Sequence, residues 1–361
     1  MMAAPAPKRP RVDAPLAIRA STAGSKGRKH TMEDVTVLVD DLMAIDAPAP
    51  AEGSGHAGAH CAWPFYAILD GHGGCDVAEA AAARLPSLLA EKLRDVPSGA
   101  SAATKDAIRR AFVACDAEML ARCKELGWAD GCCVIGVLID SAARRAYVAN
   151  LGDSRAFAAV STGGGGAGGG DAGSGSGGGG AGGSAGGSAG SSAGLKAVAL
   201  SKDHSPLEPA ERKRIEGAGG FVERGRVCAS LEVSRSLGDA RLKSSGLSAT
   251  PDVTSFALDQ RAQRFLLLGC DGLWRVFSGV QAVHWLAERL PAMDADRARL
   301  DALFADATAT SALTKEALAA ASRERDGASE AALLRAMVHE AVHARNAKDN
   351  ITAILVRLWD E

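Results

Sequence analysis

The chain has 361 residues, of which 47% are hydrophobic and 23% are charged, a composition typical of a globular protein with a sizeable core. The formal net charge is only −2, and 4% of the residues are aromatic. These values argue against a basic surface or a base-stacking platform, so we expect no nucleic-acid partner.

The sequence contains neither a secretory signal peptide nor a run of about 20 apolar residues. Its eight cysteines are scattered and include no C-x-x-C pair. Such a distribution is typical of thiols that stay reduced. We therefore expect a protein of the cytoplasm or nucleus, or both, that is not bound to a membrane.

The first residues are rich in proline, alanine and basic side chains, and we predict a disordered basic tail over residues 1–15. The run KRPR (8–11) has two interpretations, a nuclear localisation signal or simply a solvated tail. We expect residues 16–361 to form a single domain.

Within this domain the hydrophobic pattern predicts both strands and helices. Because the strands come in hairpin-like pairs and several helices follow one another, we predict an α+β fold with antiparallel sheets. Strands are predicted at residues 35–39, 65–69, 133–139, 145–150, 155–160, 196–200, 264–269 and 351–358. Helices are predicted at residues 76–94, 103–125, 208–217, 279–290, 297–321 and 329–345.

Residues 161–194 are almost wholly glycine, serine and alanine and cannot bury a core. We predict a flexible loop inserted within the domain, between the strands at 155–160 and 196–200. The entropy of loop closure grows only with the logarithm of length, so this insertion costs on the order of 1 kcal/mol more than a short loop.

Acidic residues lie at the ends of four predicted strands. Asp70 and Asp271 each follow an apolar run and precede a glycine, in FYAILDGHGG and FLLLGCDGLW. Glu33 and Asp34 precede the apolar run VTVLV, and Asp349 lies just before ITAILV. Carboxylates that meet at one edge of a sheet assembly repel one another and require cations. Hard oxygen ligands with few histidines favour Mg²⁺ or Mn²⁺ over zinc.

The segment DGHGG (70–74) has the residues that such a site needs. The two oxygens of Asp70 could bridge two cations, and the carbonyl of Gly71 can approach closely because this residue has no side chain. His72 lies within reach of a bound group, and its ordinary pKa of about 6.5 suits a proton donor. The alternative is an ordinary strand–turn–helix connection with a surface aspartate.

Six motifs, in this order, resemble those of the metal-dependent type 2C serine/threonine protein phosphatases, and especially of plant members. They are KHTMED (29–34), DGHGG (70–74), NLGDSR (150–155), LEVSRSLGD (231–239), CDGLW (270–274) and KDNIT (348–352). The resemblance covers most of the chain and implies a four-layer α/β/β/α sandwich, in which helices flank two mainly antiparallel sheets. It also implies a single, monomeric catalytic domain that hydrolyses phosphoserine and phosphothreonine on phosphorylated proteins.

The resemblance further implies a role for individual residues. A water between two metal ions would attack phosphorus in line, without a covalent phosphoenzyme, and His72 would protonate the leaving oxygen. Residues 203–247 resemble the flap beside the catalytic cleft; they contain no tryptophan, so we do not expect the receptor-dependent control used by one plant branch. The residues implied to bind or surround two Mg²⁺ or Mn²⁺ ions are Asp70, Gly71, Asp271, Asp349, Glu33 and Asp34.

Two positions depart from the family pattern. Lys29, preceded by Arg28, stands where an arginine usually binds the substrate phosphate. Lysine lacks the planar fork, so we expect phosphate binding weaker by roughly 1–2 kcal/mol unless Arg28 replaces it. Arg275 stands where an acidic residue usually helps Asp153 and Asp271 hold a third metal ion. The positive charge of a guanidinium disfavours a metal ion there. We therefore expect Asp153 to form an ion pair with Arg275 instead of binding a metal. A weakly active or inactive module that binds phosphoproteins is therefore the alternative.

The sequence HEAVH (339–343) raises a remote alternative, a zinc metalloprotease. On a helix, His339 and His343 would share one face, with Glu340 between them. The extended motif requires a glycine and a third histidine where this chain has Asn346 and Asp349. An ordinary helix surface is therefore the stronger interpretation.

Overall fold

The computed structural model describes residues 16–45, 62–162, 194–259, 263–310 and 329–360. The predicted tail at 1–15 and nearly all of the predicted loop at 161–194 lie outside these ranges. Seven cysteines fall within them, and all seven are free. None of the helices described there is both long and apolar enough to cross a membrane.

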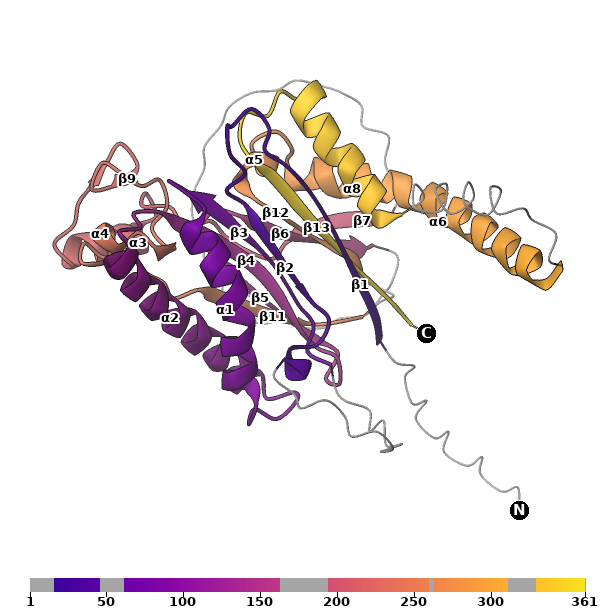
Figure 1. The fold of residues 1–361 in the computed structure, drawn as a ribbon, viewed down its shortest axis with the longest axis horizontal. Helices are drawn as coiled ribbons and strands as arrows, with labels where there is room; N and C mark the ends of the chain where they lie inside the picture. The colour runs from indigo at the N-terminus through magenta and orange to yellow at the C-terminus, as the bar shows by residue number, and fades with distance from the viewer. Residues whose placement is uncertain (1–15, 46–61, 163–193, 260–262, 311–328, 361) are drawn as a thin grey trace, which may run out of the picture.

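Two antiparallel sheets stack face to face at the centre of the molecule (Figure 1). Sheet A has the order β1 (Leu16–Ser25), β13 (Ile351–Asp360), β12 (Gln263–Gly269), β6 (Arg155–Ser161) and β7 (Leu195–Ala199). Sheet B has the order β11 (Asp252–Ala257), β5 (Arg145–Leu151), β4 (Gly131–Asp140), β3 (Phe65–His72) and β2 (Val35–Val39), with β10 (Leu237–Gly238) also paired to β4.

Helices cover the outer face of each sheet. The antiparallel pair α1 (Asp76–Leu93) and α2 (Ser101–Leu126) packs on sheet B, while α6 (Gly279–Thr310) and α8 (Glu330–His339) pack on sheet A (Figure 1). The predicted α/β/β/α sandwich is therefore confirmed. The shorter elements are η1 (Leu42–Ala44), α3 (Pro209–Gly217), β8 (Val222–Glu223), β9 (Arg226–Val227), α4 (Ala240–Lys243), α5 (Asp271–Trp274) and a π-helix, η2 (Glu340–Ala344).

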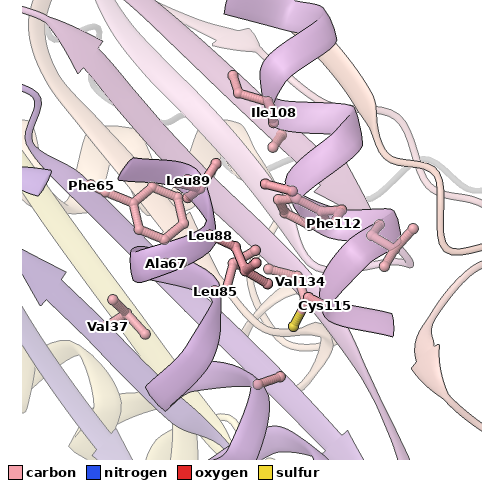
Figure 2. Packing of buried hydrophobic residues seen from close by; sticks show 14 of the residues in the cluster. Val37, Phe65, Ala67, Leu85, Leu88, Leu89, Ile108, Phe112, Cys115 and Val134 are labelled. Atoms are coloured by element: carbon pink, nitrogen blue, oxygen red, sulfur yellow. The ribbon is translucent and has the colours of Figure 1, made fainter. Parts of the chain in front are cut away.

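Each pair of adjacent layers encloses an apolar core, and strand β3 contributes to two of them. Phe65, Ala67 and Leu69 point toward α1 and α2, whereas Tyr66 and Ile68 point toward sheet A. A strand that is buried on both faces has a continuous apolar sequence, which explains the run FYAIL. Figure 2 shows the core under the helices, where the sheet residues Val37, Phe65, Ala67 and Val134 face Leu85, Leu88, Leu89, Ile108 and Phe112.

All eight predicted strands occur, but the edge strands β1 and β11 were not predicted. Strand β1 is only half-buried, and its pairing with β13 joins the two ends of the chain, so its local sequence carries little signal. Strands β6 and β7, which flank the glycine-rich run, pair antiparallel as a hairpin.

The break predicted between two helices, after residue 290, was wrong. The helices expected at 279–290 and 297–321 form one helix, α6, which continues through Pro291 to Thr310; residues 311–321 lie outside the described ranges. A proline can be accommodated inside a long helix when the helix bends locally. The helix expected at 329–345 is α8 followed by the π-helix.

Candidate active site

The acidic residues selected from the sequence meet where the ends of the two sheets come together. Asp70 lies in β3, Asp271 begins α5, and Asp349 precedes β13. They share a cavity of about 230 Å³, whose wall does not include Arg28 or Asp34. The cavity is lined by Lys29, Glu33, Asp70, Gly71, His72, Gly73, Cys133, Asp153, Arg226, Leu231, Glu232, Val233, Asp271, Arg275 and Asp349.

Asp70 is held from two sides. One of its oxygens, Oδ2, accepts hydrogen bonds from the Ser154 hydroxyl at 3.2 Å and from the backbone N–H of Asp271 at 3.3 Å. These contacts link sheet B to the segment that follows β12 of sheet A. The two D-G motifs are therefore in direct contact.

Asn350 joins the motifs from the two ends of the chain. Its Oδ1 accepts from the backbone N–H of Glu33 at 2.8 Å, and its Nδ2 donates to the Lys26 carbonyl at 3.0 Å. The backbones are so close that a Cβ on Gly71 would lie 2.4 Å from the Glu33 carbonyl oxygen, and one on Gly272 would lie 1.9 Å from that of Asn350. Glycine is required at both positions for this close approach.

Burial and mutual repulsion raise the pKa values of Asp34, Asp70 and Asp153. The pKa of Asp70 is well above its ordinary value because the group is buried and because Asp34, Asp271 and Asp153 place negative charge near it. Burial raises the pKa of Asp34 to about 6 and that of Asp153 to about 6. These carboxylates are therefore costly to keep ionised without a nearby cation.

Near Asp70 there are three potential donor atoms, of which the two carboxylate oxygens suit a hard divalent cation and the Cys270 thiol does not. Asp34, Asp70 and Cys270 each offer one atom, and these atoms lie within 4.8 Å of one another. The Thr352 hydroxyl donates to Asp34 Oδ2 at 2.7 Å, whereas Asp34 Oδ1 is buried without a hydrogen-bond partner. A buried carboxylate oxygen without a partner is costly, and a cation or its water shell would satisfy it.

Two basic side chains pair with these carboxylates. The Nζ atom of Lys29 lies 3.1 Å from Asp349 Oδ1. Arg275 Nη2 lies 2.6 Å from Asp271 Oδ2, and Nη1 lies 3.8 Å from Asp349 Oδ2. The expected pairing of Arg275 with Asp153 was wrong, because one turn of helix α5 places the guanidinium beside Asp271 instead.

His72 is fixed by a residue whose role was not predicted. Its Nε2 lies 2.8 Å from Oδ2 of Asp239, and this oxygen also accepts from the Ser236 hydroxyl at 2.6 Å. Burial disfavours the imidazolium, but the hydrogen bond and charge of Asp239 outweigh it and raise the pKa of His72. The sequence indicated only that Asp239 belongs to the motif LEVSRSLGD. The spacing of this motif does not predict a contact between Asp239 and His72.

The flap predicted at 203–247 forms one wall of the cavity and is anchored by a buried carboxylate. Glu211 of α3 accepts from Arg235 at 2.6 and 3.0 Å, from Arg214 at 2.6 Å and from the Ser234 hydroxyl at 2.6 Å. This network holds the segment whose side chains reach the cavity. Those side chains are Arg226, Leu231, Glu232 and Val233.

The HEAVH motif lies on α8 and the π-helix and does not contribute to the cavity wall. His339 and His343 are exposed, with ring centroids 4.3 Å apart. Glu340 is engaged by Arg345 Nε at 3.0 Å and by the indole N–H of Trp285 at 2.5 Å. This glutamate is therefore not available as the base of a protease.

Comparisons with known proteins place this chain in a family. The family model described as Protein phosphatase 2C matches residues 20–326. The probable protein phosphatase 2C 8 of Arabidopsis thaliana is 32% identical over 345 residues, which cover 94% of this chain and 78% of that protein. The integrin-linked kinase-associated serine/threonine phosphatase 2C of Homo sapiens is 30% identical, over 94% of this chain and 72% of its own length.

The fold has a close counterpart among solved structures. A serine-threonine phosphatase 2C from Toxoplasma gondii superposes with a TM-score of 0.62 over 96% of this chain and 98% of that chain, at 20% identity. The family-model match covers most of the chain, and the two relatives match over nearly all of it. The chain therefore belongs to the protein phosphatase 2C family of metal-dependent serine/threonine protein phosphatases.

Proposed function

We propose that this chain hydrolyses phosphoserine and phosphothreonine on proteins, at a site in the acidic cavity that holds two Mg²⁺ or Mn²⁺ ions. The observation that supports this most directly is that Asp70, Asp271 and Asp349 line one cavity although they lie far apart in the sequence. Their electrostatic environment supports it too, because burial raises the pKa values of Asp70 and Asp271 and a bound cation would relieve that cost.

We assign the cation ligands from the cavity wall. Asp70 and the Gly71 carbonyl would bind on the sheet B side, and Asp271 and Asp349 on the sheet A side. Glu33 and Asp34, the latter with a carboxylate oxygen within 4.8 Å of one of Asp70, would hold water molecules around the ions. The bound ions would supply the positive charge that activates water and neutralises the phosphate.

We assign His72 as the proton donor to the serine or threonine oxygen that leaves phosphorus. Asp239 holds Nε2, so the transferred proton would come from Nδ1. The raised pKa of His72 favours the protonated form before transfer. Lys29, at the cavity wall, is the proposed ligand of the substrate phosphate.

A second candidate is a weakly active or inactive module that binds phosphoproteins. Lys29 and Arg275 favour it, because they pair with two of the proposed metal ligands, Asp349 and Asp271. Arg275 also disfavours a third metal ion at Asp153, because it adds positive charge to the cavity that both residues line.

We also propose that residues 16–361 form one catalytic domain, with a flexible loop at 161–194, and that it acts as a monomer on phosphorylated proteins. The family match over residues 20–326 supports the single domain. The free thiols are consistent with a cytoplasmic or nuclear location.

The test is the hydrolysis of a phosphothreonine peptide with and without Mn²⁺, by the unmodified chain and by Asp70→Asn. We expect metal-dependent turnover that falls more than a hundredfold in the variant. Asp106→Asn is the matched control, because it makes the same change at an exposed position on α2 and should retain activity. Peptide binding without turnover by the unmodified chain would favour the second candidate, and equal turnover by both aspartate variants would contradict the proposal.

A further inference from the structure

Arg275 places a fixed positive charge against the carboxylates of the cavity. Its Nη2 lies 2.6 Å from Asp271 Oδ2, and its Nη1 lies 3.8 Å from Asp349 Oδ2. The side chain of Asp271 is only 20% exposed, whereas that of Arg275 is 57% exposed. The guanidinium therefore reaches from the rim of the cavity toward its floor, with room to move outward.

The same guanidinium also approaches the flap. Its Nη2 lies 3.8 Å from Oε2 of Glu232, whose other oxygen pairs with Arg226. Both flap residues line the cavity. Arg275 thus lies between two sets of acceptors, the carboxylates on the cavity floor and Glu232 on its rim.

A divalent cation bound to Asp271 would compete with the Arg275 guanidinium for the negative charge of this carboxylate. A cation coordinated there would also repel the positive charge of Arg275 over a few ångströms in a partly buried site, where the repulsion is only partly screened. Glu232 is an acceptor left to the displaced guanidinium, and Nη2 already lies 3.8 Å from its Oε2.

We infer that Arg275 is a built-in counter-cation that competes with divalent metal for Asp271 and Asp349 and moves to Glu232 of the flap when metal binds. This inference rests on the proposed metal site. It makes Arg275 a determinant of metal affinity: the chain requires more metal than it would without this side chain. It also links the occupancy of Asp271 to a contact of the flap.

The direct test is the affinity of the metal-free full chain for Mn²⁺, measured by isothermal titration calorimetry and by the electron paramagnetic resonance signal of free Mn²⁺. Arg275→Met keeps most of the side-chain volume but removes the charge, and we expect it to tighten Mn²⁺ binding about tenfold. Arg155→Met is the matched control, because Arg155 lines an adjoining pocket with Asp271 but binds Asp203, at 2.7 and 2.8 Å. We expect the control to stay within threefold of the unmodified chain.

The contact with the flap is tested by adding Glu232→Gln. In the presence of Arg275 this change removes the negative charge that would attract the displaced guanidinium. It should therefore weaken Mn²⁺ binding at least threefold more than it does in the Arg275→Met background. Equal effects in the two backgrounds would overturn the proposed move to Glu232.

Two results would overturn the proposal that Arg275 competes with the metal. One is an Mn²⁺ affinity of Arg275→Met within twofold of that of the unmodified chain. The other is an equal increase in Mn²⁺ affinity in Arg155→Met. These outcomes differ from failure of the proposed metal site, on which the proposed function depends. In that case the unmodified chain would bind no Mn²⁺ in the cavity, and Asp70→Asn would leave the titration unchanged.

Discussion

Glu211 is predicted to be the main electrostatic anchor of the flap. It is buried, and its two oxygens accept four hydrogen bonds, from Arg235, Arg214 and Ser234. Glu211→Gln would leave the Arg235 guanidinium, whose side chain is 16% exposed, without its main charge partner. Removing one member of a buried ion pair is much more costly than removing an exposed one.

The size of the effect follows from the pKa of Glu211. Although burial alone would raise this pKa, the hydrogen bonds and charges of Arg235, Ser234 and Arg214 lower it from the usual 4.5 to about 2. This lowering corresponds to about 3 kcal/mol of folding free energy at neutral pH. Because the pKa is lowered on folding, the stabilisation is complete above pH 4.5 and is lost as the pH falls toward 2.

The assay is urea unfolding at a series of pH values, combined with hydrogen exchange in residues 211–236. At pH 7, Glu211→Gln should destabilise the flap by about 3 kcal/mol, and its difference from the unmodified chain should shrink below pH 4.5. Glu216→Gln on the same helix is the matched control, because its pair with Arg212 is exposed and should contribute less than about 0.5 kcal/mol. Equal effects of the two substitutions at pH 7 would refute this account of the anchor.

Three further predictions concern the site and the rejected protease. Lys29→Arg should lower the KM for a phosphothreonine peptide about fivefold, because a guanidinium can bind two phosphate oxygens; an unchanged KM would show that Lys29 is not the phosphate ligand. Asp239→Asn should lower kcat at least tenfold for that peptide but little for p-nitrophenyl phosphate, whose leaving group needs no proton from His72; equal losses on both substrates would contradict the proton-donor role. His339→Ala should leave phosphatase kcat and KM unchanged, and a loss of peptidase activity in this variant would restore the zinc-protease alternative.

The central strands could be predicted from the sequence because the fold buries them on both faces. In β13, Ile351, Ala353 and Leu355 pack under the helices, while Ile354 and Val356 face the other sheet, so the strand is a continuous apolar run. The edge strands β1 and β11 have no such signal, since they are half-exposed and depend on distant partners.

The contacts within the site also differ in whether the sequence could predict them, because some are set by local spacing and others by the pairing of distant strands. Arg275 is the C-cap residue of α5 and follows Asp271 by four residues. This spacing pairs opposite charges on a helix, so the ion pair was predictable from CDGLWR alone. The pair of His72 with Asp239 was not predictable in this way, because it exists only where β10 is added to β4 beside β3. A sequence motif can thus identify which residues are needed, but the pairing of strands decides which of them touch. The cavity itself depends on that pairing, since β3 belongs to one sheet and β12 and β13 to the other, and their acidic ends meet only because an apolar core holds the two sheets face to face.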